Sequence, residues 1–267
     1  QQALTQTNIA QPALGAADMG LFHLLEALGV RPDMVAGHSY GEYVALCAAG
    51  VFSEEALCTL SEARGRSIIE SAGHDLGTMA AVHARPERIA EALGSLEDVW
   101  IANLNAPEQT IISGPRIAVE EAVERLKARG IQARSIPVAC AFHSPLVAPA
   151  QERLAEFLST IEFAAPRLEV FSNTTAAPYP RDPRAIAALL AEHLVRPVEF
   201  ASEVEAMYRA GARIFVEVGP RNVLTNLVQQ ILGERPYLAV VLDVPGRSGL
   251  LQLHHALGQL AAHGVPL

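Results

Sequence analysis

A five-residue segment, 37–41 (Gly-His-Ser-Tyr-Gly), limits what this chain can fold into more than any other. It matches G-x-S-x-G, a sharp strand-to-helix turn that exposes a serine hydroxyl as a nucleophile. Residues 33–38 are predicted as a short strand and residues 42–50 as the start of a helix. Both glycines are expected to avoid side-chain collisions where strand and helix meet. Ser39 is therefore the candidate nucleophile, and a chance match is the alternative.

Size and charge exclude several classes of protein. The chain has 267 residues, 50% of them hydrophobic, which suits one large α/β domain or a large domain with a small insert. Its formal net charge is −9, so we expect no nucleic-acid partner, because phosphate binding needs a basic face. We expect no membrane partner either, since no apolar run reaches spanning length and no signal-peptide pattern begins the chain.

The cysteines carry no metal or redox motif. Cys47, Cys58 and Cys140 show neither C-x-x-C pairing nor metal-ligand spacing. A reduced, cytoplasmic compartment is the simplest interpretation, and no metal site is expected.

Residues 77–137 differ from the rest in their order of elements. Strands and helices alternate there as β-α-β-β-α-β, which is the order of a ferredoxin-like unit. The predicted strands are 78–82, 99–103, 109–113 and 133–138, and the predicted helices are 87–93 and 116–129. We expect this segment to be a small α+β subdomain inserted into a larger unit.

Residues 1–76 and 138–267 are predicted to form that larger α/β unit. Buried strands alternate with helices, which favours a parallel sheet covered on both faces. The predicted strands are 33–38, 168–172, 213–218 and 237–242; the predicted helices are 11–29, 53–72, 145–160, 182–194, 199–210, 222–232 and 248–263.

A serine nucleophile needs a base, and His143 is the histidine that stands apart. It follows a short apolar run and comes just before Pro145, where a helix is predicted to begin. This is a loop at a strand end, the place where α/β sheets carry site residues. A histidine that only caps the helix is the alternative.

The order of residues argues against an ordinary hydrolase. The acid that follows a predicted strand, Asp243, comes after His143, whereas α/β-hydrolases run serine, acid, histidine. A backbone carbonyl can orient the imidazole instead, which would give a dyad.

Three further polar positions carry candidate binding groups. Arg64, 25 residues after Ser39, would bind a carboxylate through both arms of its guanidinium if it were buried; a solvated arginine on a helix face is the alternative. Asn103 and Asn105 flank a predicted strand end, where turn residues are more common than ligands.

Together these motifs resemble those of the malonyl-CoA:acyl carrier protein transacylases and of the acyltransferase domains of polyketide and polyunsaturated fatty acid synthases. The matching segments, in chain order, are Ala10-Gln-Pro-Ala-Leu14, Gly37-His-Ser-Tyr-Gly-Glu42, Cys47-Ala-Ala-Gly50, Arg64-Gly-Arg66, Gly77-Thr-Met-Ala80, Asn103-Leu-Asn-Ala-Pro107, Ile112-Ser-Gly114, Ala141-Phe-His-Ser144, Arg196-Pro-Val-Glu-Phe200 and Glu217-Val-Gly-Pro220. The resemblance implies a hydrolase-like parallel-sheet core that carries a ferredoxin-like insert.

The resemblance also implies roles for the matching residues. Ser39 would be the nucleophile and His143 the base. Arg64 would bind the free carboxylate of an extender unit such as malonyl. Asn105 matches a polar position near the site, and the backbone carbonyl of His193 would orient His143.

The resemblance implies that three further residues affect the pocket for the acyl group. His38 would line it. Tyr40 would supply a backbone N–H, and its ring replaces a small aliphatic residue common in the family, which bears on pocket size. Phe142 stands where malonyl-selective members tend to carry phenylalanine, so we expect malonyl to be preferred over methylmalonyl.

One family segment has no counterpart in this sequence. Members normally open with a strand and a Gly-Gln-Gly-Ser-Gln turn whose backbone helps to form the oxyanion hole. The sequence is therefore expected to be a fragment of a longer protein, or to obtain that piece elsewhere. Residues 250–267 resemble the linker that follows such domains in multidomain synthases.

These observations predict an acyltransferase that moves a malonyl unit from CoA to the phosphopantetheine thiol of an acyl carrier protein through an acyl-serine. No bound cofactor is expected, and the CoA thioester is the substrate. The expected partners are malonyl-CoA, a carrier protein and other domains of a multidomain synthase. The alternatives are a serine esterase or thioesterase, and a non-catalytic docking module of a synthase.

Overall fold

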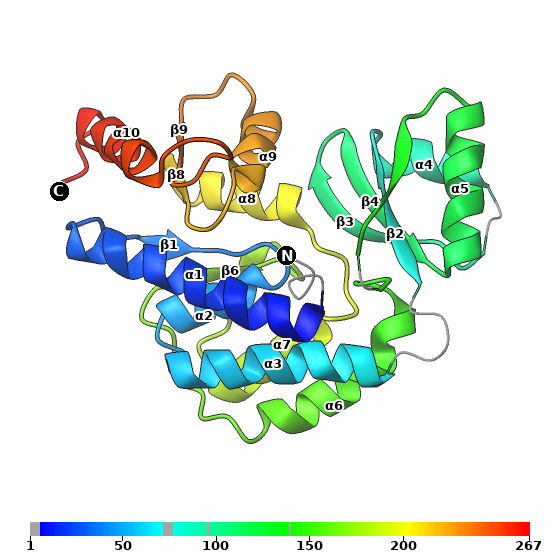
Figure 1. The fold of residues 1–267 in the computed structure, drawn as a ribbon, viewed down its shortest axis with the longest axis horizontal. Helices are drawn as coiled ribbons and strands as arrows, with labels where there is room; N and C mark the ends of the chain where they lie inside the picture. The colour runs from blue at the N-terminus through cyan, green and yellow to red at the C-terminus, as the bar shows by residue number, and fades with distance from the viewer. Residues whose placement is uncertain (1–5, 72–76, 95–96, 139) are drawn as a thin grey trace.

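A computed structural model describes residues 6–71, 77–94, 97–138 and 140–267 (Figure 1). The helices within these ranges are α1 (Thr7–Ala27), α2 (Gly41–Ala48), α3 (Glu54–Ser71), α4 (Pro86–Leu93), α5 (Arg116–Ala128), α6 (Ala148–Leu158), α7 (Pro183–Glu192), α8 (Phe200–Arg209), α9 (Val223–Leu232) and α10 (Gly249–Ala262). The strands are β1 (Met34–Val35), β2 (Thr78–Val82), β3 (Trp100–Ala106), β4 (Gln109–Gly114), β5 (Ala133–Ile136), β6 (Glu169–Ser172), β7 (Ala177–Pro178), β8 (Ile214–Glu217) and β9 (Leu238–Val241).

The larger unit is the expected α/β core, but its strands divide into two groups. β1 pairs in parallel with β6, and β8 pairs in parallel with β9. No strand hydrogen bond in the described ranges joins the two pairs, so the single parallel sheet that was expected is not formed. Leu25, Leu242 and Leu260 pack in one cluster, which attaches β8–β9 to the core through α1 and α10. The short β7 runs antiparallel to β6.

Helices α1, α3, α6 and α7 pack in series beside β1 and β6 (Figure 1). Helix α3 begins as predicted, because the Ser53 hydroxyl accepts the N–H of Ala56 and Glu54 and Glu55 lie in its first turn. Residue 72, the predicted end of this helix, lies outside the described residues.

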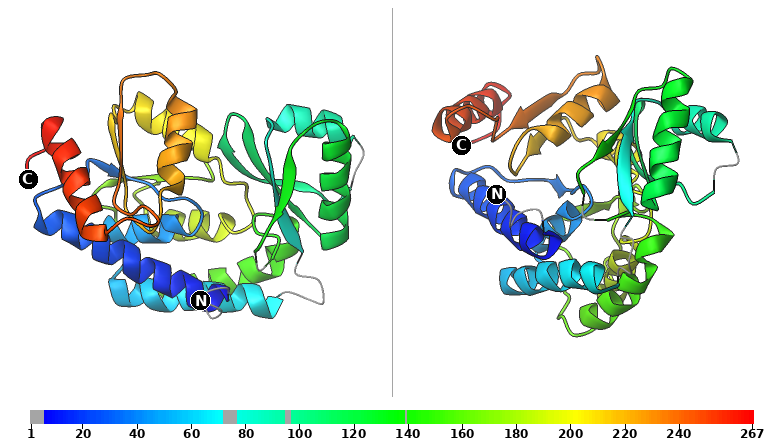
Figure 2. Two further views of the ribbon diagram at one scale, coloured as in Figure 1. Left: turned by 45° about the horizontal axis from the view of Figure 1, so that its top comes forward. Right: turned by 45° about the vertical axis from the view of Figure 1, so that its right-hand side comes forward.

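The smaller unit has the predicted β-α-β-β-α-β order. Its antiparallel sheet runs β3-β4-β2-β5, and α4 and α5 cover one face (Figure 2). Ala80 and Val82 point into the cluster formed with these helices, whereas Met79 lies on the opposite face of β2. We propose that residues 77–137 form one unit and that 1–76 with 138–267 form the other.

A short backbone link joins the two units beside the site. Leu104 N–H donates to the carbonyl of Val198, and Val198 N–H donates to the carbonyl of Ala102. This parallel bridge holds the segment before α8 against β3. It thereby fixes the backbone near Arg196 relative to the insert.

Candidate active site

The turn between β1 and α2 holds Ser39 in a strained backbone conformation. Its φ is 53°, a region that non-glycine residues enter at a cost of roughly 1–3 kcal/mol and that is common at functional sites. A Cβ built at Gly37 would lie 1.9 Å from the carbonyl carbon of Gly41, so only glycine fits there. A side-chain collision was also expected at Gly41, and that expectation is wrong: apart from its chain neighbours and its own helix backbone, a Cβ there would meet no described atom within 4 Å.

Ser39 and His143 meet in this turn. The Ser39 Oγ lies 2.7 Å from the His143 Nε2. The His143 Nδ1 lies 3.2 Å from the His193 carbonyl and 3.0 Å from the Arg196 carbonyl. Carbonyls only accept, so Nδ1 carries the proton and Nε2 is free to accept one from the serine. The His193 carbonyl was expected; that of Arg196 was not, since a backbone group leaves no mark in the sequence.

Arg64 is buried and incompletely paired. Only 2% of the residue is exposed, which excludes a solvated arginine on a helix face. Its Nη1 donates to the Oε1 of Gln11 at 2.9 Å, and its guanidinium lies 5.2 Å from the ring centre of Tyr43. Nε and Nη2 have no partner among the described residues. A buried cation with two free N–H groups is suited to an anionic ligand.

His38 and Asn105 come together from the two units. The His38 Nε2 donates to the Asn105 Oδ1 over 2.7 Å, and the His38 ring lies edge-on to Phe200, 5.2 Å between ring centres. Asn105 lies in β3 of the insert and is 8% exposed. The site therefore lies where the insert meets the core.

A family model described as the acyl transferase domain matches residues 1–249. This chain belongs to the acyl transferase domain family. It is 38% identical over 267 residues to the polyketide synthase GfsA of Streptomyces halstedii. The aligned region covers 99% of this chain but only 4% of that protein. Its sequence and structure therefore account for a small part of that relative.

Solved structures share the fold of this acyl transferase domain. The acyltransferase domain from the second module of the salinomycin polyketide synthase superposes with a TM-score of 0.92 at 36% identity, over 99% of this chain and 62% of that one. The malonyl CoA-acyl carrier protein transacylase from Coxiella burnetii gives 0.85 at 34% identity, over 96% and 81%. The predicted fold class, an α/β core with a small subdomain, is confirmed.

Asn173 holds the turn that carries Ser39 in this acyl transferase domain. Its Oδ1 accepts the Ser39 N–H at 2.6 Å, and its Nδ2 donates to the Gly37 carbonyl at 2.8 Å and to the Glu203 Oε2 at 2.6 Å. Asn173 was not predicted as a site residue. Its place directly after β6, at the carboxyl end of a parallel strand, is a signal that could have found it.

Two buried carboxyl groups support Asn173. Glu42 accepts the backbone N–H of Asn173 and the hydroxyl of Tyr179. Burial raises the pKa of Glu42 to about 7 and raises that of Glu203 well above its usual range. Because the neutral form costs less to bury, protons on these groups favour the folded turn.

The remaining predicted residues lie in different surroundings. The Tyr40 ring turns into the core, where its hydroxyl lies 2.6 Å from the Ser61 Oγ, so only its backbone faces the turn. The His193 ring is fully buried, edge-on to His143 at 5.4 Å between ring centres. Phe142 is partly buried and packs against clusters of both units.

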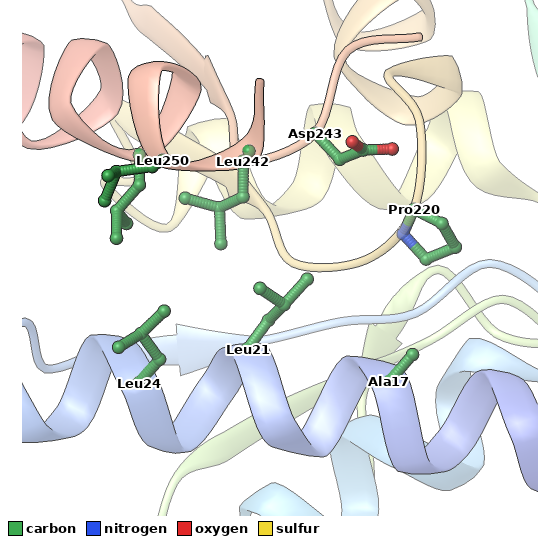
Figure 3. Close-up of a pocket in the computed structure, with 9 residues that line it drawn as sticks. Ala17, Leu21, Leu24, Pro220, Leu242, Asp243 and Leu250 are labelled. Carbon is green, nitrogen blue, oxygen red and sulfur yellow. The ribbon is translucent and has the colours of Figure 1, made fainter. Parts of the chain in front are cut away.

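Asp243 does not serve as a triad acid. Its Oδ2 accepts the backbone N–H of Arg221 at 2.7 Å. It lines a cavity of about 460 Å³ between α1 and α10 (Figure 3). The other residues around this cavity are Ala17, Leu21, Leu24, Pro220, Leu242, Gly249, Leu250 and Leu253. Neither Ser39 nor His143 borders it.

Metal and membrane features are not found in the described ranges. No group of three or more His, Cys, Asp or Glu side chains there could hold a metal ion. Within the same residues, no helix is both long and apolar enough to cross a bilayer.

His143 stays neutral in the folded domain. Burial, assisted by the nearby charges of Arg64 and His38, lowers its pKa to about 3, although the two carbonyls at Nδ1 oppose the shift. A neutral imidazole can accept the serine proton at any pH above that value.

This pKa predicts an unusual pH profile. The rate at which Ser39 is acylated should change less than about twofold between pH 7 and pH 5, because the imidazole is unprotonated throughout. A histidine at the ordinary value of 6.5 would lose roughly 25-fold over the same interval. Single-turnover acylation measured by rapid quench distinguishes the two, and a limb near pH 6.5 would contradict the assignment.

Proposed function

We propose that this domain transfers a malonyl unit from CoA to the phosphopantetheine thiol of an acyl carrier protein. The observation that carries the proposal is the Ser39–His143 pair together with the buried Arg64, whose charge acts on His143 and whose Nε and Nη2 have no partner among the described residues. The Coxiella burnetii relative, described as a malonyl CoA-acyl carrier protein transacylase, supports the choice of substrate and acceptor. The acyltransferase domain of the salinomycin synthase supports a place among other synthase domains.

The first half-reaction loads the serine. The Ser39 Oγ attacks the thioester carbonyl carbon while the His143 Nε2 removes the hydroxyl proton. The resulting oxyanion is stabilised at the start of α2 by the Tyr40 N–H, which has no acceptor among the described residues. The C–S bond then breaks, and the CoA sulfur leaves with the proton from His143. An acyl ester on Ser39 remains.

The second half-reaction reverses these steps with a different thiol. His143 takes the proton from the phosphopantetheine thiol, whose sulfur attacks the ester carbonyl. The C–O bond to Ser39 breaks, and His143 returns the proton to the serine oxygen. The carrier thioester leaves, so no cofactor is consumed and none needs to be resident.

The binding groups determine which acyl unit is accepted. Arg64 pairs with the free carboxylate of malonyl through Nε and Nη2, the N–H groups without a partner among the residues described. His38 and Asn105, hydrogen-bonded to each other, form a polar wall of the site. Phe142 limits space beside the acyl carbon, which favours malonyl over methylmalonyl.

We also place the domain in the cytoplasm, where the free thiols of Cys47 and Cys140 remain reduced.

Intact mass spectrometry tests the proposal in two steps. Incubation with malonyl-CoA should add one malonyl group to the chain, and addition of a phosphopantetheinylated carrier protein should move that group onto the carrier. Release of free malonate in place of transfer would indicate a thioesterase. A folded chain that forms no ester would indicate a docking module.

A further inference from the structure

We infer that Gln11, itself held by Thr7, is a positioning residue that fixes the Arg64 guanidinium for the substrate carboxylate; this inference rests on the proposed function. The Gln11 Oε1 accepts from the Arg64 Nη1 at 2.9 Å. The Gln11 Nε2 donates to the Thr7 Oγ1 at 2.6 Å. All three side chains are buried, with exposed fractions of 6% for Thr7, 6% for Gln11 and 2% for Arg64.

Chemistry fixes the direction of this chain of hydrogen bonds. A guanidinium only donates, so Gln11 must turn its carbonyl oxygen toward Arg64. Its NH₂ group then needs an acceptor, which the Thr7 hydroxyl provides. The amide of Gln11 therefore has one favourable orientation and cannot flip without breaking both contacts.

The contacts of Arg64 leave one edge of the guanidinium available. Gln11 occupies Nη1, and the Tyr43 ring lies near the guanidinium at 5.2 Å. Nε and Nη2, which have no partner in the part of the chain that the structure describes, lie on the same edge of the planar group and can bind both oxygens of a carboxylate. By taking Nη1, Gln11 determines which edge is offered.

The backbones of α1 and α3 prevent this arrangement from relaxing. A Cβ built at Gly65 would lie 2.4 Å from the Cα of Asn8, so the two helices touch beside the pair. Gln11 and Arg64 thus face each other across a fixed gap.

The ratio of malonyl to acetyl loading tests the inference, because acetyl lacks the carboxylate. In single-turnover acylation of Ser39, Gln11→Met should lower this ratio about tenfold, the usual effect of a lost charged hydrogen bond. Gln11→Glu should lower it more, since its carboxylate would pair with Arg64 in place of the substrate. Gln252→Met is the matched control: it also removes a buried amide, which bonds the Val241 carbonyl, and should leave the ratio unchanged.

Thr7 provides a second measurement that does not depend on how the Gln11 variants fold. Thr7→Val removes the acceptor and should lower the malonyl-to-acetyl ratio, whereas Thr7→Ser keeps the hydroxyl and should restore it. Equal losses for both acyl groups in Gln11→Met and Thr7→Val would indicate a structural role only and would overturn the inference.

Arg64→Ala separates this inference from the proposed function. Loss of malonyl preference in Arg64→Ala, with the wild-type ratio kept in the Gln11 variants, would overturn the inference alone. A wild-type ratio in Arg64→Ala would refute the carboxylate site on which both depend. Parallel losses in Arg64→Ala and Gln11→Met are the expected result.

Discussion

Replacing Gly37 with alanine is expected to destabilise the fold by about 3 kcal/mol or more, since inserting a methyl group against fixed backbone forces the elements apart. The new Cβ would lie 1.9 Å from the carbonyl carbon and 2.1 Å from the carbonyl oxygen of Gly41. The contact is with backbone, so no side-chain rotation relieves it. Asn173 also bonds the Gly37 carbonyl, so the strain would spread to the side chain that holds Ser39.

Gly41→Ala is the matched control for this prediction. It adds the same methyl group four residues away, at the first residue of α2, where no described atom outside its chain neighbours and its own helix backbone lies within 4 Å. Its effect on the free energy of unfolding should stay within about 0.5 kcal/mol. Urea unfolding of both variants measures the difference in the free energy of unfolding. Equal stabilities would contradict the close approach of Gly37 to the Gly41 backbone.

Strong local patterns account for what the sequence could predict. The strand predicted at residues 78–82 has the same bounds as β2. This prediction succeeded because a run of apolar residues follows directly after Gly77. Residues 109–113 and 116–129 match β4 and α5 to within one residue. The glycine-serine turn and the loop before Pro145 led to Ser39 and His143 because both depend on short, contiguous signals.

Contacts between distant segments account for what the sequence could not predict. The two residues of β7 are too few to show a periodicity. Asn173 lies 134 positions from Ser39 and Gln11 lies 53 from Arg64, so neither contact leaves a local pattern. The inward turn of the Tyr40 ring likewise depends on space beside Ser61, which a single sequence does not reveal.

Removing either member of the Ser39–His143 pair should abolish most of the acyl transfer. Ser39→Ala leaves no oxygen for the ester, so no acyl-enzyme should appear by intact mass. His143→Ala leaves the hydroxyl without a base and should slow acylation by about 10²–10⁴-fold. The double variant should be no slower in overall transfer than Ser39→Ala, because the two residues act as one unit.

His255→Ala is the matched control for His143→Ala, since His255 is exposed and lies in α10, outside the site. It should keep the wild-type acylation rate. Full acylation in His143→Ala would show that another group removes the proton, despite the 2.7 Å contact with the Ser39 Oγ. Losses that multiplied in the double variant would show that the two side chains act independently. The shared proton between Oγ and Nε2 predicts that they do not.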